Sequence, residues 1–290
     1  MATKLIADDV SKEEGGGLDT LSGTVLGTKK GLDVSSADHL LAVAAGNVSG
    51  QILVNKFGAN GAVGTTWESI TSDGIYRTPT ALTSLEIVSD DNTNDISSGT
   101  GARKVTIIGL STGWTEVTEE VSLNGTTAVA LANQYFRVYR MYVSESGAYA
   151  TAISPSHDST ITLRVSGAGD EWASINTDGS YGLGQSEIGA FSVPDGYIAY
   201  LMNYNIDVES NKAVDVALFT RESADDVSTP FSGVMRVKAI KRAIDGSHKS
   251  QPHGPILSLV GPADIGFLGK VSSGSAKLEV EFQILLIADT

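Results

Sequence analysis

The sequence predicts an all-β protein of two antiparallel β-sandwich or jelly-roll-like domains, preceded by an extended N-terminal arm. Short runs rich in Val, Ile, Thr, Tyr and Phe alternate between apolar and polar residues, which is the pattern of half-buried strands. Turn-forming pairs such as Asp178-Gly179 and Asp195-Gly196 separate these runs. Sustained helical periodicity is nearly absent, so we expect strands to form most of the fold.

The clearest strand lies near the C-terminus. There Leu278, Val280, Phe282 and Ile284 alternate with charged or amide side chains, which places the four apolar residues on one face. Residues 161–165 alternate in the same way. The same criterion predicts further strands at residues 84–88, 103–110, 116–123, 135–143, 189–193, 198–205, 214–220 and 234–239.

Two local features refine this strand pattern. Asn124-Gly125 lies between two short apolar runs and predicts a hairpin with a two-residue type I′ turn. Residues 37–45 fit a helix that is capped by Ser35 or Ser36 and stopped by Gly46, but they fit a strand nearly as well.

Changes in composition predict four segments. Residues 1–36 hold few large apolar residues and a run of three glycines, so we expect an extended arm. Residues 37–165 form the first predicted β-sandwich domain, and residues 166–186 form a Gly-rich connection. Residues 187–290 form the second sandwich or jelly-roll domain.

The composition also excludes several classes of protein. With no cysteine in 290 residues, the chain has no disulfides, Cys-ligated metals or thiol nucleophiles. No apolar stretch approaches the ~20 residues that span a bilayer, so we expect a soluble chain with no membrane partner. A net charge of −14 opposes nucleic-acid binding. For the basic stretch at residues 236–249, a solvated or partner-facing strand is favoured over a nucleic-acid site.

The sequence predicts no metal site and no cofactor. The histidines are scattered, and the two that lie near each other, His248 and His253, fall in a Pro-containing segment. Residues 90–95 begin like a calcium-binding EF-hand loop, but Asp95 stands where that loop needs glycine. A polar loop is therefore favoured over a calcium site.

No catalytic residues are predicted either. Glu116, Glu119 and Glu120 raise the question of a glycosidase, which needs two carboxylates that face each other across a cleft. On a strand, however, Glu119 points away from the other two. We therefore expect a non-enzymatic protein.

One predicted strand is rich in aromatic residues and arginine. Residues 135–142 place aromatic or apolar groups together with arginine on both faces, a composition that is enriched in protein interfaces. We therefore favour a role in the core and in an interface over a ligand groove. The interface candidates are Tyr135, Arg137, Tyr139, Arg140 and Tyr142.

A series of turn and strand segments extends from residue 50 to the C-terminus. It includes residues 54–60 (VNKFGAN), 99–102 (GTGA), 105–110 (VTIIGL), 119–129 (EEVSLNGTTAV), the aromatic strand and residues 193–197 (VPDGY). Together these segments resemble a group of tailed-bacteriophage virion structural proteins that decorate the head or form fibres. The resemblance implies a particle component built of β-sandwich modules, and it carries over no catalytic residue.

We therefore predict a bacteriophage virion structural protein, either a capsid-exterior decoration or cement protein or a head-fibre subunit. We expect a homo-oligomer that binds other virion proteins, the major capsid protein among them, and that assembles in the host cytoplasm. The alternative is a tail-associated receptor-binding protein that recognises a glycan, with Trp114, Trp172 and Tyr181 as stacking platforms. A carbohydrate-active enzyme is a third hypothesis, but it needs an acid pair that the sequence does not place.

Overall fold

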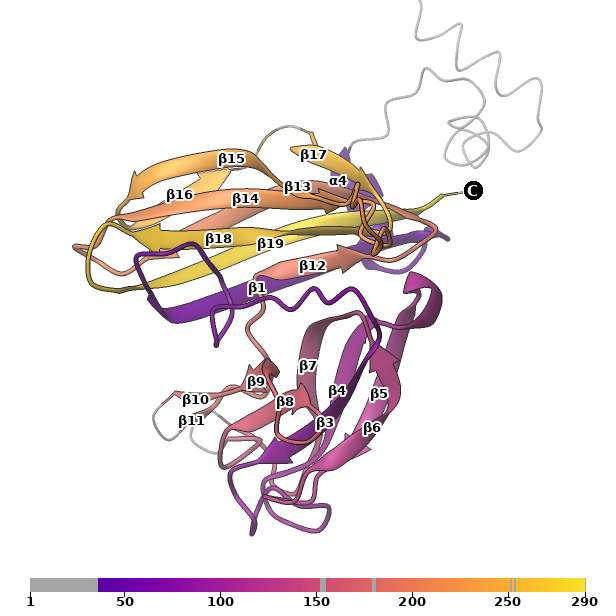
Figure 1. The fold of residues 1–290 in the computed structure, drawn as a ribbon. Coiled ribbons are helices and arrows are strands. Elements are labelled where there is room, and N and C mark those ends of the chain that lie inside the picture. Colours follow the sequence, from indigo (N-terminus) through magenta and orange to yellow (C-terminus); the bar gives the residue numbers. More distant parts are fainter. Residues whose placement is uncertain (1–35, 152–154, 179–180, 251, 253, 290) are drawn as a thin grey trace, which may run out of the picture. The chain divides into compact units, whose positions relative to one another are not determined.

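The computed structural model describes residues 36–151, 155–178, 181–250, 252 and 254–289. It confirms the predicted fold class, because the chain is almost entirely β and its strands form several antiparallel sheets in a sandwich-like arrangement (Figure 1). The chain divides into two compact units, residues 1–53 and 54–290. The predicted N-terminal arm lies, apart from Ser36, outside the described residues. In the described part of the chain, no helix has the length and apolarity that a membrane crossing requires.

In the first unit, the segment that fitted both a helix and a strand is a helix, α4 (Ser36–Ala44). It ends at Gly46, which has a φ of +73°. The amide of Asn47 donates to the carbonyl of Ala42, and the amide of Gly46 donates to that of Val43. These two bonds form a Schellman motif, which satisfies carbonyls that the helix end would leave unpaired.

Strands from residues 190–288, together with β1 and β2 from residues 51–69, form a sandwich of two sheets that is called here the C-terminal sandwich. The first, called here the β19 sheet, has the order β1 (Gln51–Val63), β19 (Ala276–Ala288), β13 (Tyr197–Val208) and β16 (Ser247–Ser250), and β17 (Leu257–Val260) also pairs with β13. The second, the β14 sheet, has the order β12 (Ala190–Val193), β18 (Ala263–Val271), β14 (Val214–Glu222) and β15 (Met235–Ile244), and β2 (Glu68–Ser69) pairs with β18.

The core of this sandwich is aromatic at its centre. The ring of Phe267 on β18 lies 5.3 Å from that of Tyr204 on β13 and 5.5 Å from that of Phe282 on β19. All three side chains are buried. Phe282 belongs to the alternating run at residues 278–284, so the predicted buried face of that strand is confirmed.

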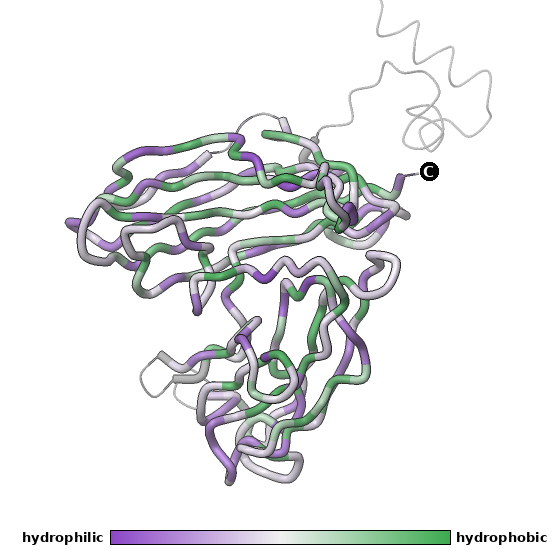
Figure 2. Tube along the Cα trace, viewed as in Figure 1, coloured by the Kyte–Doolittle hydropathy of each residue, from purple (hydrophilic) through white to green (hydrophobic). Residues whose placement is uncertain are grey.

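Strands that lie between residues 83 and 175 form a second, N-terminal sandwich. One sheet has the order β6 (Val129–Tyr135), β3 (Thr83–Ser89), β8 (Ile161–Val165) and β9 (Glu171–Ile175), and the other has β5 (Glu116–Ser122), β4 (Ala102–Leu110) and β7 (Arg137–Ser146). A short 3₁₀ turn, η1 (Thr112–Trp114), joins β4 to β5, and β10 (Thr177–Asp178) pairs with β11 (Tyr181–Gly182). Hydrophobic residues recur along the strands of both sandwiches (Figure 2).

Strand pairing does not follow the ranges predicted for the domains. β1 and β2 lie within residues 37–165, yet they pair with β19 and β18 of the C-terminal sandwich. β9 lies in the predicted connection, yet it pairs with β8. At Gly58 on β1, an added Cβ would come within 2.0 Å of the Gly189 backbone nitrogen, so two distant segments meet where neither has a side chain. Alternation along a strand carries no information about such a partner.

The predicted hairpin at Asn124-Gly125 is wrong. β5 and β6 belong to different sheets, so the chain crosses between sheets here instead of folding back on itself. Gly125 has a φ of +60°, and its amide donates to the Asp95 carbonyl at 3.0 Å. The turn is therefore held by the segment at residues 89–96 and not by pairing of its flanking strands.

Candidate interaction surface

Exposed apolar side chains gather on one short segment. Among the described residues, five of the twelve large hydrophobic side chains that are exposed lie between positions 231 and 240. Their exposed fractions run from 42% to 50%. They are Phe231, Val234, Met235, Val237 and Ile240.

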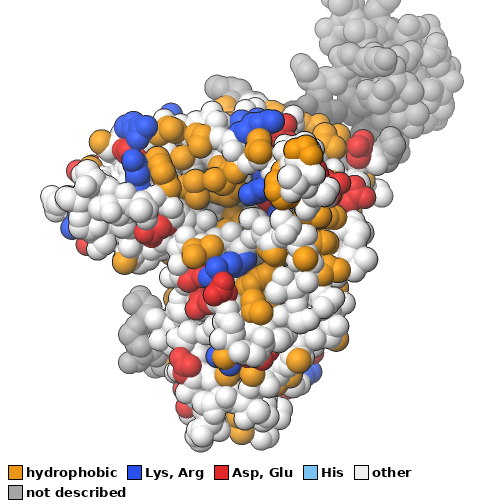
Figure 3. All heavy atoms as spheres, in the orientation of Figure 1, with side chains coloured by type: hydrophobic (Ala, Val, Ile, Leu, Met, Phe, Trp, Pro, Cys, Tyr) orange, Lys and Arg blue, Asp and Glu red, His pale blue; other side chains and the backbone are white. Residues whose placement is uncertain are grey.

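Strand register places three of them on the outer face of the β14 sheet. Val237 lies opposite Phe219, Ile240 lies opposite Ala217, and Met235 lies opposite Arg221. Residues directly opposite in an antiparallel pair share a face. The surface that results is called here the apolar face, and Figure 3 shows hydrophobic side chains gathered over β14, β15 and β18. It consists of Ala217, Phe219, Met235, Val237, Ile240 and Leu268.

The floor of the apolar face is closely packed. Phe219 is 4% exposed, and its ring lies across Gly266 on the neighbouring strand β18. A Cβ at Gly266 would come within 2.9 Å of this ring, so glycine is needed for the ring to lie there. The floor is therefore rigid, and Met235, Val237 and Ile240 project from its edge strand.

Charged pairs lie beside the apolar face. Arg242 Nη1 lies 2.5 Å from Asp215 Oδ2 in the outer row of β14, and Lys238 Nζ lies 2.7 Å from Glu222 Oε1, which ends the other row of the same strand. The bond from Lys238 holds the pKa of the Glu222 carboxyl below its ordinary value. Burial opposes ionisation of Asp215, but bonds from the Ala243 amide and Arg242 outweigh it and lower its pKa. An apolar centre with a charged margin is the usual composition of a protein interface.

The edge of the β14 sheet disfavours pairing with a further strand. Among the described strands, β15 pairs with β14 alone, and this pairing has register shifts at two places. Bulges and cationic side chains on an edge strand are devices that prevent strand addition. A partner is therefore expected to pack on the apolar face and not to extend the sheet.

The sequence did not identify the apolar face. It predicted a strand at residues 234–239, which the structure confirms, within a basic stretch interpreted as solvated or partner-facing. The register places Met235 and Val237 on the outer face, while Arg236 shares the other face with buried Thr220. The alternation did not indicate this arrangement, because Met235, Val237 and Ala239 form an apolar row of the kind that usually faces the core.

The aromatic strand predicted as an interface lies largely inside the chain. Tyr135, Arg137 and Tyr139 are 0%, 1% and 3% exposed, so they are not available to a second chain in this structure. Arg140 and Tyr142 are half-buried. Tyr139 is buried where β7 packs against the C-terminal sandwich, with its ring 4.7 Å from that of Phe191, whereas Tyr135 on β6 is buried within the N-terminal sandwich, where its hydroxyl donates to Glu119.

Arg137 joins the two sandwiches through a buried ion pair. Its Nε and Nη2 each lie 2.9 Å from a carboxylate oxygen of Asp264 on β18. Ser192 also donates to this carboxylate. Both charged side chains are at most 2% exposed. The mixture of arginine with aromatics that suggested an interface thus serves a contact within the chain.

Two of the three proposed stacking platforms, Trp114 and Trp172, are buried. Trp114 is 7% exposed and stacks on Phe136 with a centroid distance of 4.5 Å, while the Arg137 guanidinium lies 4.9 Å from its ring. Trp172 is 4% exposed. Tyr181 belongs to β11, and its side chain lies outside what the structure describes. A sugar therefore cannot stack on Trp114 or Trp172 in this structure.

The glutamates of β5 contribute hydrogen bonds within the sandwich. The Glu119 carboxylate accepts hydrogen bonds from the amides of Ala132 and Asn133 and from the Tyr135 hydroxyl, at 2.6, 3.1 and 3.0 Å. Burial opposes its ionisation, but these bonds outweigh that effect and hold the Glu119 pKa below its ordinary value. Glu116 accepts from the Tyr139 hydroxyl. The carboxylates thus link strands of the N-terminal sandwich.

The acidic loop at residues 90–95 is closed by its own hydrogen bonds. Asp91 Oδ1 accepts from the amides of Thr93 and Asn94 at 2.7 and 2.5 Å. Asp95 is fully buried and accepts from Ser89 Oγ and the Ala102 amide, both at 2.8 Å. Among the described residues, no three His, Asp or Glu side chains gather in a way that could hold a metal ion.

Comparisons with known proteins give no close relative. No family model matches the sequence, and no curated protein matches it. Among solved structures, the chain is weakly similar to the VP2 capsid protein of infectious bursal disease virus. A D431N mutant VP2 is 10% identical with a TM-score of 0.19, covering 83% of this chain and 74% of that one. The Gx strain structure is 10% identical with a TM-score of 0.20, covering 82% and 75%. Similarities with TM-scores this low support no conclusion about the fold or the function of this chain.

Proposed function

We propose that this chain is a non-enzymatic structural subunit of a virus particle, with capsid-exterior decoration, cement or head-fibre subunit as the specific role. The sequence segments that resemble tailed-phage virion proteins support this proposal. The observation that carries it is the apolar face, because three apolar side chains that are 42–50% exposed need a partner surface to leave water.

The partner assigned to the apolar face is a second copy of this chain. The chain carries a net charge of −14, while the ten residues of β15 hold four cations and no acidic residue. The charged margin therefore selects and orients the acidic surface of another copy in a head-to-tail contact, while burial of the apolar centre supplies most of the affinity. Head-to-tail contacts form rings when the rotation between subunits closes, and repeated contacts of this kind hold subunits on a lattice.

The alternative function, glycan recognition by a tail-associated protein, is not supported at Trp114 or Trp172. Trp114 and Trp172 are buried, and their rings are occupied by packing within the chain. We therefore place the structural role first.

The test at the level of the particle is the number of copies of this chain per purified particle, measured by quantitative mass spectrometry against the shell protein. A ratio near that of the shell subunits supports a decoration or cement role. A handful of copies overturns a role that covers the shell, and absence from the particle overturns the proposal.

The test at the level of the surface is Val237→Glu, with self-association measured by sedimentation equilibrium. A buried charge in the centre of the contact is expected to weaken association at least tenfold and to lower incorporation into particles. The matched control is Glu279→Lys, an exposed charge change on the outer face of the β19 sheet. Equal association of wild type and Val237→Glu overturns the assignment of the apolar face.

A further inference from the structure

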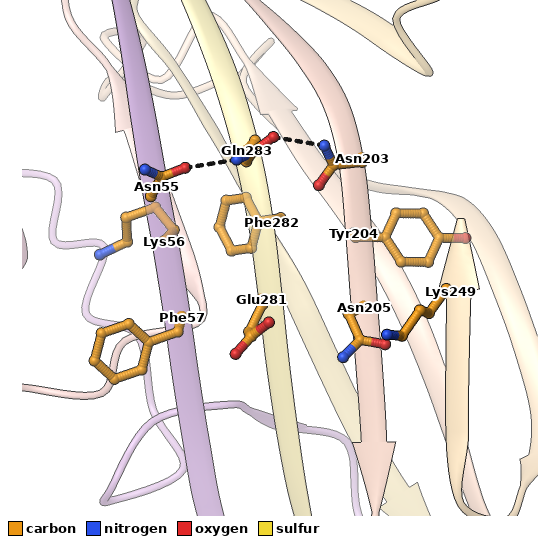
Figure 4. A pocket seen from close by; sticks show the side chains of 10 residues that line it. All are labelled: Asn55, Lys56, Phe57, Asn203, Tyr204, Asn205, Lys249, Glu281, Phe282 and Gln283. Atoms are coloured by element: carbon orange, nitrogen blue, oxygen red, sulfur yellow. Dashed lines mark hydrogen bonds between the residues drawn. The ribbon is translucent and has the colours of Figure 1, made fainter. Parts of the chain in front are cut away.

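The outer face of the β19 sheet carries a row of hydrogen-bonded amides. Gln283 on β19 donates through Nε2 to Asn55 Oδ1 on β1 at 2.9 Å, and it accepts at Oε1 from Asn203 Nδ2 on β13 at 2.6 Å (Figure 4). A register shift between Leu201 and Asn203 precedes the pairing of Asn203 with Gln283. Three amides from three strands are thus fixed side by side.

A second row lies beside the amides and encloses a groove of about 400 Å³. Phe57 from β1 and Asn205 from β13 are half-buried and lie on either side of exposed Glu281 from β19 (Figure 4). Asn205 also lies opposite Lys249 on β16. Within the described chain, the Glu281 carboxylate and the Lys249 ammonium make no hydrogen bond or ion pair with another side chain. Both remain available to a ligand.

The lining selects a hydroxylated, uncharged ligand. Each amide of the row keeps donors or acceptors beyond those used within the row. Glu281 and Lys249 balance each other in the groove, because the remaining charged residue of the lining, buried Lys56, donates its ammonium to the Tyr139 carbonyl. An anion therefore meets Glu281, and a cation meets Lys249. Phe57 supplies an apolar wall next to these groups. A few convergent polar groups beside an apolar surface, in a volume of this size, are typical of a small-molecule site.

We propose that this groove binds a neutral saccharide. Hydroxyl groups of a sugar both donate and accept, so they match amides, which do the same. The Glu281 carboxylate is placed to accept from neighbouring hydroxyls, and the apolar C–H surface of the sugar lies against Phe57. This site shares no residue with Trp114, Trp172 or the apolar face.

The test is binding of the full chain to an array of neutral oligosaccharides built from glucose, galactose, mannose and N-acetylglucosamine, with sulfated and sialylated sugars as a second group. At least one neutral sugar is expected to bind, and Glu281→Ala and Gln283→Ala are expected to reduce that binding at least tenfold. The matched control, Glu279→Ala, changes a glutamate of the same strand and face outside the groove and keeps binding unchanged. Thermal melting of each variant separates loss of the site from loss of the fold.

Three outcomes overturn the proposal. They are the absence of binding to every neutral sugar, binding that survives both groove variants, and binding confined to the sulfated or sialylated sugars. Because the measurement needs no particle, its result is independent of the copy number that tests the structural role.

Discussion

The two outer faces of the C-terminal sandwich differ in kind. On the β19 sheet, the outer row of β19 reads Lys277, Glu279, Glu281 and Gln283, and the neighbours of this row on β13 are also polar. On the β14 sheet, the outer row of β15 reads Met235, Val237 and Ile240. Both sheets contribute side chains to one aromatic core, so the difference is confined to the side chains on their outer faces.

A polar outer face and an apolar outer face are suited to different roles. A polar face needs no cover, and its side chains can be fixed by one another, as the amide row is. An apolar face is stable in water only at a cost of roughly 25 cal/mol for each Å² left exposed, so it favours burial against another surface. One sandwich thus offers a face for a soluble ligand and a face for a subunit.

The largest expected effect is that of Asp264→Ala. Asp264 lies in the same outer row of β18 as Leu268 of the apolar face, at the end that Arg137 of the N-terminal sandwich covers. The change leaves Arg137 buried without its carboxylate, so we expect a loss of about 3–5 kcal/mol in the free energy of unfolding. Urea denaturation measures it. The matched control is Asp215→Ala in the same sheet, whose partner Arg242 is exposed, with an expected loss of about 1 kcal/mol or less. Equal losses in the two variants would contradict the role of the buried pair.

A second prediction assigns part of the acid sensitivity of the fold to Glu119, which lies in the N-terminal sandwich and away from both outer faces. Its pKa is lowered below the ordinary 4.5, so its stabilisation is complete above that pH and is lost as pH falls through the folded pKa. Glu119→Gln is expected to cost about 1–3 kcal/mol at pH 7, because an amide cannot accept all the bonds that the carboxylate accepts.

The measurement is the free energy of unfolding against pH for wild type and variant. The difference between them should shrink below pH 4.5, where wild type loses the same interaction. Self-association, which depends on the apolar face, should stay unchanged between about pH 5 and 8. A difference in stability that is constant across the whole range would falsify the assignment.

The strands and the sites were not equally predictable from the sequence. The alternation around Phe282 predicts the buried face of β19 correctly, because this strand has a core on one side and solvent on the other, and its apolar and polar residues alternate accordingly. The apolar face was missed because an edge strand meets few neighbours, so its two rows are not sorted by burial. Arg137 was misjudged for a different reason: its partner Asp264 is 127 residues away. The amide row also joins distant segments, since Asn55 and Gln283 are 228 positions apart.

The salt dependence of self-association distinguishes the contribution of the apolar side chains from that of the charged residues beside them. If association depends on Met235, Val237 and Ile240, raising NaCl from about 0.05 to 0.5 M should change the dissociation constant by less than about threefold, because burial of apolar area is not screened. Sedimentation equilibrium at both concentrations gives this ratio. A much larger weakening would mean that the cations of β15 hold the subunits together and the apolar face does not.

The smallest expected effect is on the polar face. Gln283→Ala removes two side-chain hydrogen bonds, each worth about 0.5–1.5 kcal/mol when buried. Asn55 is exposed and Asn203 half-buried, so water replaces the lost bonds, and the net loss in unfolding free energy should stay below about 1 kcal/mol. Urea denaturation beside Glu279→Ala checks this value. A loss above about 2 kcal/mol would show that the amide row supports the fold, and loss of sugar binding in that variant would then report on folding. A small loss means that the row is an ordered surface kept at little cost to stability, as a binding site requires.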